Sequence, residues 1–221
     1  MKNSECCYFF HGVFNSLRRY RFNPQDIDAL DYTGVYIIFE KGELAHDKLD
    51  RIVRVGTTTG KKSVLKDRLY EHYNNEGRSV FRNNIAVSLL KKNGDPLCLS
   101  GLFYRSDNEK YRIGSKIERE KWKRNVANDA ELCEYERINN EVSKYIRENC
   151  SFAILPAKRD ICTLWEGYLL KTISSCNVCK QSDNWLGNYI PKERKKIRES
   201  GLWNIKHVKD RDIIIDEDYT H

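Results

Sequence analysis

The sequence lacks any apolar run of the roughly 18 to 20 residues that a membrane-spanning helix requires. Its opening residues also lack the long apolar stretch and the small-residue cleavage site of a signal peptide. These absences argue against a membrane or secreted protein and predict a cytoplasmic one. No internal repeat or low-complexity linker divides the 221 residues, and this length favours a single domain.

The eight cysteines lack the density of a disulfide-rich scaffold, because they are spread along a chain that is too long for one. We expect reduced thiols and no structural disulfides. Cys176 and Cys179 have the CxxC spacing of half a zinc knuckle, with Cys150 and Cys162 upstream. A second CxxC pair or a histidine pair at finger spacing is missing, so the spacing disfavours a zinc site.

Basic residues exceed acidic ones, with 39 Lys and Arg against 32 Asp and Glu and a formal net charge of +7. This surplus suits a polyanionic partner such as nucleic acid, although many basic proteins have no such partner. The densest basic run, KERKKIRES, covers residues 192–200. It is either a phosphate-contacting surface or an ordinary solvated helix face.

Hydrophobic periodicity predicts a mixed α/β (α+β) fold in which a small central β-sheet is flanked by helices. Residues 32–40 and 51–58 are rich in β-branched and aromatic side chains and predict two neighbouring antiparallel strands. A third, buried strand is expected at 151–157 and a final one at 201–208. Helices are expected near the start of the chain, from Ser63, from Ser79, at 116–126, at 130–149 and after Asp160.

The expected organisation is an N-terminal arm at 1–31, one domain at 32–208 and a C-terminal tail at 209–221. The mostly charged stretch from about 105 to 149 is interpreted as a helical insertion into that domain. It separates elements that would lie closer together in a minimal domain.

Local signals predict where several helices begin and end. Ser63 and Ser79 precede segments of helical periodicity and are the expected N-caps, while Asn93-Gly94 is the expected end of the second helix. The helix after Asp160 is expected to bury one apolar face, made of Leu164, Tyr168, Leu169 and Ile173.

Two short motifs lie on the two neighbouring strands, Gly34-Val35-Tyr36 on the first and Arg54-Val55-Gly56 on the second. The helix that follows carries Arg68 and, one turn later, His72, which places both side chains on one helix face. Far along the chain, Glu166 lies in the otherwise apolar helical segment LWEGYLL. This ordered set resembles the GIY-YIG nuclease superfamily, including its restriction-endonuclease-like members.

The resemblance covers most of residues 32–204 outside the insertion and implies a metal-dependent endonuclease. It implies that Tyr36 acts as general base, that Arg68 stabilises the phosphate and that Glu166 binds Mg²⁺ or Mn²⁺. Phosphodiester hydrolysis does require a base, a counter-charge for the transition state and help for the leaving group. A cation and a phosphate nearby would make Tyr36 a better proton acceptor, but His72 can also take a proton at neutral pH. Which of the two deprotonates the water stays open.

Arg54 stands where the family usually has a tyrosine. Its guanidinium either neutralises a phosphate near the site or marks a catalytically degenerate module that binds nucleic acid without cleaving it. The family commonly has an Asn after the glutamate, and Asn177 and Asn184 compete for that role. Further phosphate contacts are expected from basic residues outside the chemistry: Lys61, Lys62, Lys192, Arg194, Lys195, Lys196 and Arg198.

Each motif also has an ordinary structural explanation. Gly34 and Gly56 are compatible with close strand packing alone, and the Arg68 helix with a solvated face of surface ion pairs. A carboxylate in an apolar helix is costly unless it is paired or bound to metal, so Glu166 either forms a structural salt bridge or holds the ion. A further alternative is an interaction protein whose basic surface meets an acidic partner, without salt-sensitive affinity for nucleic acid.

The expected substrate is double-stranded DNA, and the arm and insertion suggest, by analogy, a restriction or genome-defence role. Because cutting both strands of a duplex needs two active sites or two visits, a homodimer is attractive. Residues 111–114, YRIG, resemble the second half-motif superficially. Their charged surroundings lack strand character, so they are rejected as a motif.

Overall fold

The computed structural model describes residues 2–58, 60, 63–74, 79–97, 99–103 and 116–205, except for the side chains of residues 116–119. Its sheet has four strands in the order β1-β4-β2-β3: Tyr20–Arg21 (β1), Gly34–Leu44 (β2), Asp50–Thr57 (β3) and Cys150–Pro156 (β4). Each neighbouring pair is antiparallel. The predicted mixed fold is confirmed, as are the strands expected at 32–40, 51–58 and 151–157.

The strand β2 lies inside the sheet and is covered on both faces, since residues 34–40 are all buried. Burial on both faces explains its continuous apolar run in place of an alternating pattern. The register places Tyr36 opposite Gly56 of β3 and opposite Ile154 of β4. Between Ile38 and Phe39 the register shifts: Ile38 pairs with Arg54 and Phe39 with Ile52, so residue 53 of β3 has no partner on β2. The pairing therefore brings the two half-motifs side by side.

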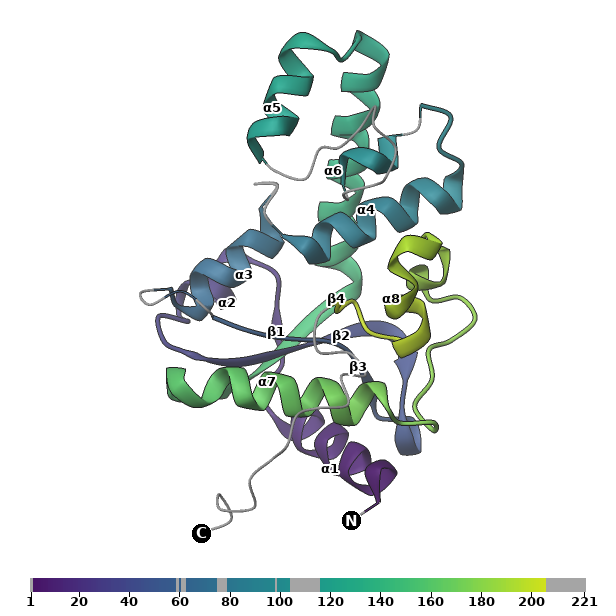
Figure 1. Ribbon diagram of the computed structural model, residues 1–221. Helices are drawn as coiled ribbons and strands as arrows, with labels where there is room; N and C mark the ends of the chain where they lie inside the picture. Colours follow the sequence, from purple (N-terminus) through teal and green to yellow (C-terminus); the bar gives the residue numbers. More distant parts are fainter. Residues whose placement is uncertain are drawn as a thin grey trace.

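Helices cover both faces of the sheet (Figure 1). One face carries α2 (Pro24–Asp28), α3 (Leu65–Tyr73), α4 (Val80–Asn93) and α6 (Asp129–Asn149), and the other carries α1 (Asn3–Ser16) and α7 (Arg159–Ser174). Successive side chains of β2 alternate between the two resulting apolar clusters, with Tyr36 in the first and Val35 and Ile37 in the second. Residues from α3 and α7 consequently approach the same strands from opposite faces.

The remaining helical elements are α5 (Lys116–Asn125), α8 (Lys195–Ser200) and short 3₁₀ turns at His46–Lys48, Leu99–Leu102, Leu186–Tyr189 and Lys192–Arg194. The helices α5 and α6 confirm those expected at 116–126 and 130–149. The helix α6 packs against α4 and continues directly into β4. Among the described helices, none combines the length and the apolar character needed to cross a bilayer.

Capping interactions explain two helix boundaries and correct a third. The Ser79 hydroxyl accepts a backbone N–H at the start of α4, and Gly94 follows its end with φ of +81°, so both predicted limits of this helix are confirmed. The N-cap of α3 is Val64, and the prediction of Ser63 is wrong. The Ser63 hydroxyl donates instead to the Gly60 carbonyl, within the loop that joins β3 to α3.

The buried face of α7 differs in part from the prediction. Leu169 and Ile173 are buried and Tyr168 is partly buried, but Leu164 is 44% exposed. Leu164 precedes Leu169 by five residues, which is ~140° around a helix, so its side chain lies off the buried stripe. The buried residue of that turn is Cys162.

Residues 201–205 do not form the expected final strand, and residues 206–208 of that prediction lie outside the described part of the chain. The segment covers the edge of β3 with separate hydrogen bonds. Trp203 donates its backbone N–H to the Val53 carbonyl at 2.7 Å, and the Asn204 side-chain amide bonds both the N–H and the C=O of Val55, at 3.1 and 2.8 Å. The register shift at Val53 interrupts the regular spacing that a fifth strand would need.

A buried carboxylate, Glu40, anchors this segment to the sheet. It accepts indole N–H bonds from Trp203 and Trp185, at 2.9 and 3.2 Å, and a hydroxyl bond from Tyr145. Burial raises the pKa of Glu40, and these hydrogen bonds oppose the rise. The Trp203 carbonyl in turn accepts a hydrogen bond from Arg54 at 2.9 Å, so the anchor also fixes a side chain of the second half-motif.

Candidate active site

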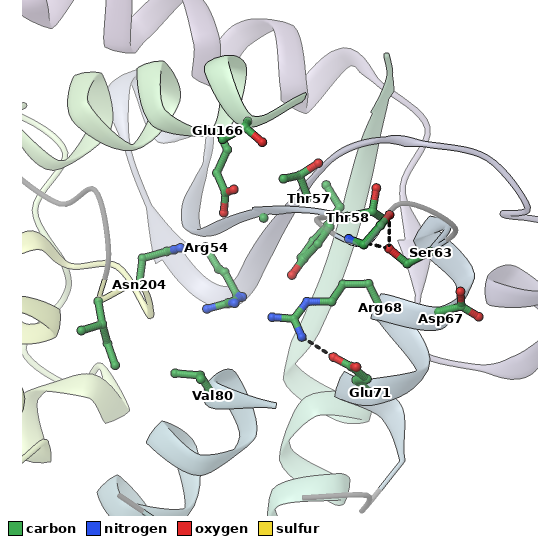
Figure 2. A pocket seen from close by; sticks show the side chains of 15 residues that line it. Arg54, Thr57, Thr58, Ser63, Asp67, Arg68, Glu71, Val80, Glu166 and Asn204 are labelled. Atoms are coloured by element: carbon green, nitrogen blue, oxygen red, sulfur yellow. Dashed lines mark hydrogen bonds and ion pairs between the residues drawn. The ribbon is translucent and has the colours of Figure 1, made fainter. Parts of the chain in front are cut away.

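An open cavity of about 620 Å³ lies at the end of β3, between α3 and α7 (Figure 2). The residues expected from both half-motifs, the following helix and α7 line it together: Tyr36, Arg54, Gly56, Arg68 and Glu166. The rest of the lining consists of Thr57, Thr58, Gly60, Ser63, Asp67, Glu71, Val80, Thr163, Asn204 and Ile205. The fold thus brings together side chains that are widely separated in the sequence.

The two motif glycines permit close approach across the sheet. A Cβ atom at Gly56 would lie 2.3 Å from the Tyr36 hydroxyl oxygen, because the Tyr36 ring lies over this position of the neighbouring strand. A Cβ atom at Gly34 would lie 2.6 Å from the Leu155 carbonyl oxygen on the other side of β2. Any larger residue at Gly56 therefore displaces the Tyr36 side chain, and one at Gly34 pushes against the backbone of β4.

We expect Gly56→Ala to lower the free energy of unfolding by about 1–3 kcal/mol, because the added methyl group overpacks against the Tyr36 ring. Urea denaturation measures the change. The matched control is Gly12→Ala in α1, where a Cβ atom meets nothing within 4 Å, and a helical Gly→Ala change is neutral or stabilising. Equal stability of Gly56→Ala and the parent chain would contradict the steric argument.

A chain of hydrogen bonds runs from Tyr36 into the core. The Tyr36 hydroxyl lies 2.7 Å from His72 Nε2, and His72 Nδ1 lies 2.7 Å from the Ser79 hydroxyl, which already accepts the Arg82 backbone N–H. Because the Ser79 oxygen already accepts one hydrogen bond, its own buried hydroxyl proton needs an acceptor. Within this chain of bonds the acceptor is His72 Nδ1, so the imidazole proton is on Nε2. His72 then donates its Nε2–H to Tyr36, and the proton of Tyr36 is free to face the cavity.

His72 is fully buried and does not line the cavity. Burial lowers the pKa of His72 well below its ordinary value, and the nearby guanidinium groups, Arg54 first, lower it further. The imidazole is therefore neutral. Although Arg68 and His72 were placed on one helix face, only Arg68 lines the cavity, because His72 continues the buried stripe of Leu65 and Leu69 along α3.

Arg68 provides a cation at the cavity wall. Its side chain is 28% exposed and forms an ion pair with Glu71, as the solvated-face alternative anticipated. Both side chains nevertheless line the cavity. Tyr36 makes the largest contribution to a raised pKa of Arg68, followed by Glu71, whereas burial opposes it. Arg68 thus lies close to the Tyr36 hydroxyl and remains charged.

Glu166 faces the cavity from α7, on the opposite side from Arg68 (Figure 2). It is half-buried, and Thr163, one helical turn earlier, also lines the cavity. At the start of α7, Arg159 donates to the Ser63 carbonyl at 2.8 Å and to the Gly60 carbonyl. These bonds connect the loop between β3 and α3 to α7. They therefore fix the positions of the two cavity walls relative to each other.

Arg54 is a buried cation in the cavity wall, with only 6% of its surface exposed. One of its terminal nitrogens donates to the Trp203 carbonyl, and its guanidinium lies 5.4 Å from the centre of the Phe81 ring. Its Nε has no hydrogen-bond partner among the described residues. This nitrogen is enclosed, so Arg54 contributes to the cavity wall mainly through its charge.

Several predicted contact residues lie elsewhere. Asn177, Asn184, Lys195 and Arg198 are exposed and do not line this cavity, and Lys61 and Lys62 lie outside the described residues. The amide that does line it is Asn204, which no periodic pattern singled out. Thr163 could have been found from its spacing of three residues from Glu166 on one helix face.

Comparison with known proteins identifies a family for the chain. A family model described as GIY-YIG domain matches residues 18–213, which include all the strands and the helices α3 and α7 that line the cavity. No curated protein and no solved structure matches the chain.

Proposed function

The chain belongs to the GIY-YIG domain family, and from this premise we propose that it is a divalent-metal-dependent endonuclease that hydrolyses phosphodiester bonds in double-stranded DNA. Membership of the family implies nuclease-type activity in general and a nucleic-acid substrate. The observation that supports the more specific proposal is the shared cavity. Tyr36 of β2, Arg68 of α3 and Glu166 of α7 line it together, and they supply a proton acceptor, a cation and a carboxylate.

The cavity suits a hard divalent cation. Glu166 contributes a carboxylate to the cavity lining, and Thr163 adds a hydroxyl oxygen one helical turn earlier. The cavity lining contains no cysteine or histidine among the described residues, and oxygen ligands are those that Mg²⁺ and Mn²⁺ prefer. Mg²⁺ keeps much of its hydration shell, so one protein carboxylate suffices to hold it. A bound ion would supply Lewis-acid stabilisation of the leaving oxygen.

In this proposal Tyr36 is the general base. His72 is neutral and enclosed, so it cannot reach a water molecule in the cavity. It donates Nε2–H to the Tyr36 oxygen, and the charge of Arg68 lies close by. Both groups direct a hydrogen-bond donor or positive charge at the Tyr36 oxygen, the atom proposed to accept the proton of the attacking water. His72 acts as a positioning residue.

The guanidinium groups hold the substrate phosphate. Arg68 faces the cavity directly and stabilises the charge that develops on the phosphoryl oxygens. Arg54 adds a second positive charge in the cavity wall, which attracts the phosphate. The exposed Lys195 and Arg198 of α8, with Lys61 and Lys62, would contact the DNA backbone away from the reaction.

The biological setting is proposed by analogy alone. Residues 1–31 and the insertion at about 105–149 are the segments that would recognise a particular DNA sequence or structure, as in a restriction or genome-defence enzyme. Cleavage of both strands would be achieved most directly by a homodimer with two active sites.

Incubation of the purified protein with supercoiled plasmid and Mg²⁺ or Mn²⁺ tests the proposal. We expect nicked or linear products, their loss in EDTA and their return when excess Mg²⁺ is added back. Discrete fragments would further support sequence-specific recognition. If neither ion supports cleavage of plasmid, single-stranded DNA or RNA, the proposed endonuclease activity is wrong.

The second candidate is a nucleic-acid-binding module that has lost cleavage. The observation in its favour is Arg54, which occupies the position of the usual tyrosine and fills part of the cavity wall. This candidate predicts binding that weakens with rising salt, without cleavage products under any metal condition. The plasmid assay and a binding titration at two salt concentrations therefore separate the two functions.

A further inference from the structure

Four potential metal ligands meet on the face of the sheet opposite α3, away from the cavity. Cys7 belongs to α1, His46 to the turn between β2 and β3, and Cys176 and Cys179 to the loop after α7. Their Sγ and imidazole nitrogen atoms all lie within 4.8 Å of one another. Three segments that are far apart in the sequence therefore converge on one point. We propose that these four residues bind a structural Zn²⁺ ion as a Cys₃His site.

The distances suit tetrahedral zinc. Cys7 Sγ lies 3.3 Å from Cys179 Sγ, and Cys176 Sγ lies 3.5 Å from His46 Nε2. In a tetrahedral site with Zn–S bonds of about 2.3 Å and a Zn–N bond of about 2.0 Å, the ligand atoms are about 3.5–3.8 Å apart. The four atoms thus need only small adjustments to enclose an ion.

The thiols of this cluster are buried, unlike cysteines that happen to meet on an exposed surface. Cys7, Cys176 and Cys179 are at most 6% exposed, and they pack in the apolar cluster formed by α1, α7 and the sheet. His46 is half-buried and directs Nε2 into the group of thiols. Three sulfur donors and one nitrogen are a ligand set that structural zinc sites use, and they differ from the oxygen donors of the cavity.

A neighbouring histidine provides the outer support that metal-bound thiolates usually have. The Ile52 backbone N–H donates to His11 Nε2 at 3.2 Å, so the proton of the neutral ring is on Nδ1. That nitrogen lies 2.9 Å from the Cys7 carbonyl oxygen and 3.5 Å from Cys7 Sγ. The Nδ1–H therefore donates mainly to the Cys7 carbonyl, and the Cys7 sulfur is a secondary partner.

Sequence spacing disfavours zinc only for ligands that are close together in the chain, and the ligands of this cluster are not. Cys150 and Cys162, the upstream cysteines, are not members of the cluster. The partners of the CxxC pair come from α1 and from the turn between β2 and β3, which only the tertiary structure brings near. An ion here would fasten α1 and the end of α7 to the sheet and so help to fix the helix that carries Glu166.

Zinc content of the full-length protein tests the proposal without any nucleic acid. Protein purified under reducing conditions from zinc-supplemented medium is analysed for metal per chain, and Co²⁺ is then exchanged into the site. We expect about one zinc per chain and the absorption bands of tetrahedral, thiolate-bound cobalt. Less than about a tenth of an equivalent of zinc, with no such bands, would overturn the proposal.

Variants assign the ligands. We expect Cys179→Ser and His46→Ala to weaken zinc binding by at least about a hundredfold in a chelator competition. Cys6→Ser, next to Cys7, and Cys133→Ser, on the exposed side of α6, are matched controls that should retain zinc. Equal affinity in all four variants would place the metal elsewhere. An intact mass that shows a Cys7–Cys179 disulfide in protein kept anaerobic would replace the zinc site by a disulfide.

The zinc and nuclease proposals can fail separately. Metal content and the cobalt spectrum are measured without a substrate, so the absence of cleavage leaves them unaffected. Conversely, a chain without zinc that still cleaves plasmid with Mg²⁺ supports the endonuclease and removes only the zinc site.

Discussion

Glu166→Gln should reduce DNA cleavage by at least about a thousandfold, which corresponds to about 4 kcal/mol of transition-state stabilisation. Glutamine keeps the size of the side chain on α7 and removes the negative charge that would hold the divalent ion in the cavity. Single-turnover rates at saturating Mg²⁺ measure the loss. DNA affinity without divalent metal should stay within about threefold, because the substitution removes no cationic contact to phosphate.

The control for this substitution is Asp160→Asn, which neutralises an exposed carboxylate at the start of α7 that does not line the cavity. Its cleavage rate should match that of the parent chain. Persistent cleavage by Glu166→Gln, at a rate that follows the protein through purification, would show that another residue holds the ion.

Tyr36→Phe should lower the cleavage rate by about a hundred- to ten-thousandfold, the range of general acid–base catalysis. The ring that packs against Gly56 remains, and only the hydroxyl that accepts from His72 is lost. The pH–rate profile gives a second readout. The rate of the parent chain should rise with pH until the base is ionised, and Tyr36→Phe should lose this dependence.

Tyr70→Phe is the matched control, because Tyr70 lies on α3 and its hydroxyl donates to Asp28 at 3.0 Å, outside the cavity. It should leave the rate and the pH profile unchanged. The role of Tyr36 as base would be excluded if Tyr36→Phe kept the parental rise with pH, since the ionising group would then be a different one.

The structure shows which part of the site local patterns could predict. The half-motifs lie on strands whose composition is typical of a buried sheet, and the glycine of the second one is explained by the opposite Tyr36 ring. Glu166 was recognisable because a carboxylate interrupts an apolar helix. In each case the signal is contained in a few consecutive residues, so no knowledge of the tertiary packing was needed.

Contacts between distant segments could not be predicted in this way. The i, i+4 spacing placed Arg68 and His72 on one face, but it could not show that the face divides between the cavity and the core. Asn204 reaches the cavity because the chain returns to the edge of β3. Likewise, nothing near Cys176 in the sequence indicates that His46 will lie 3.5 Å from it.

The covered edge of β3 limits how two copies of this chain can associate. An edge strand with open N–H and C=O groups is a template for pairing with another chain. Here His11 accepts from Ile52 N–H, Trp203 donates to the Val53 carbonyl, and Asn204 occupies both groups of Val55. Intermolecular sheet extension and the aggregation that follows from it are therefore blocked along this stretch. A homodimer would therefore not form by pairing this stretch of β3 with the same stretch of a second copy.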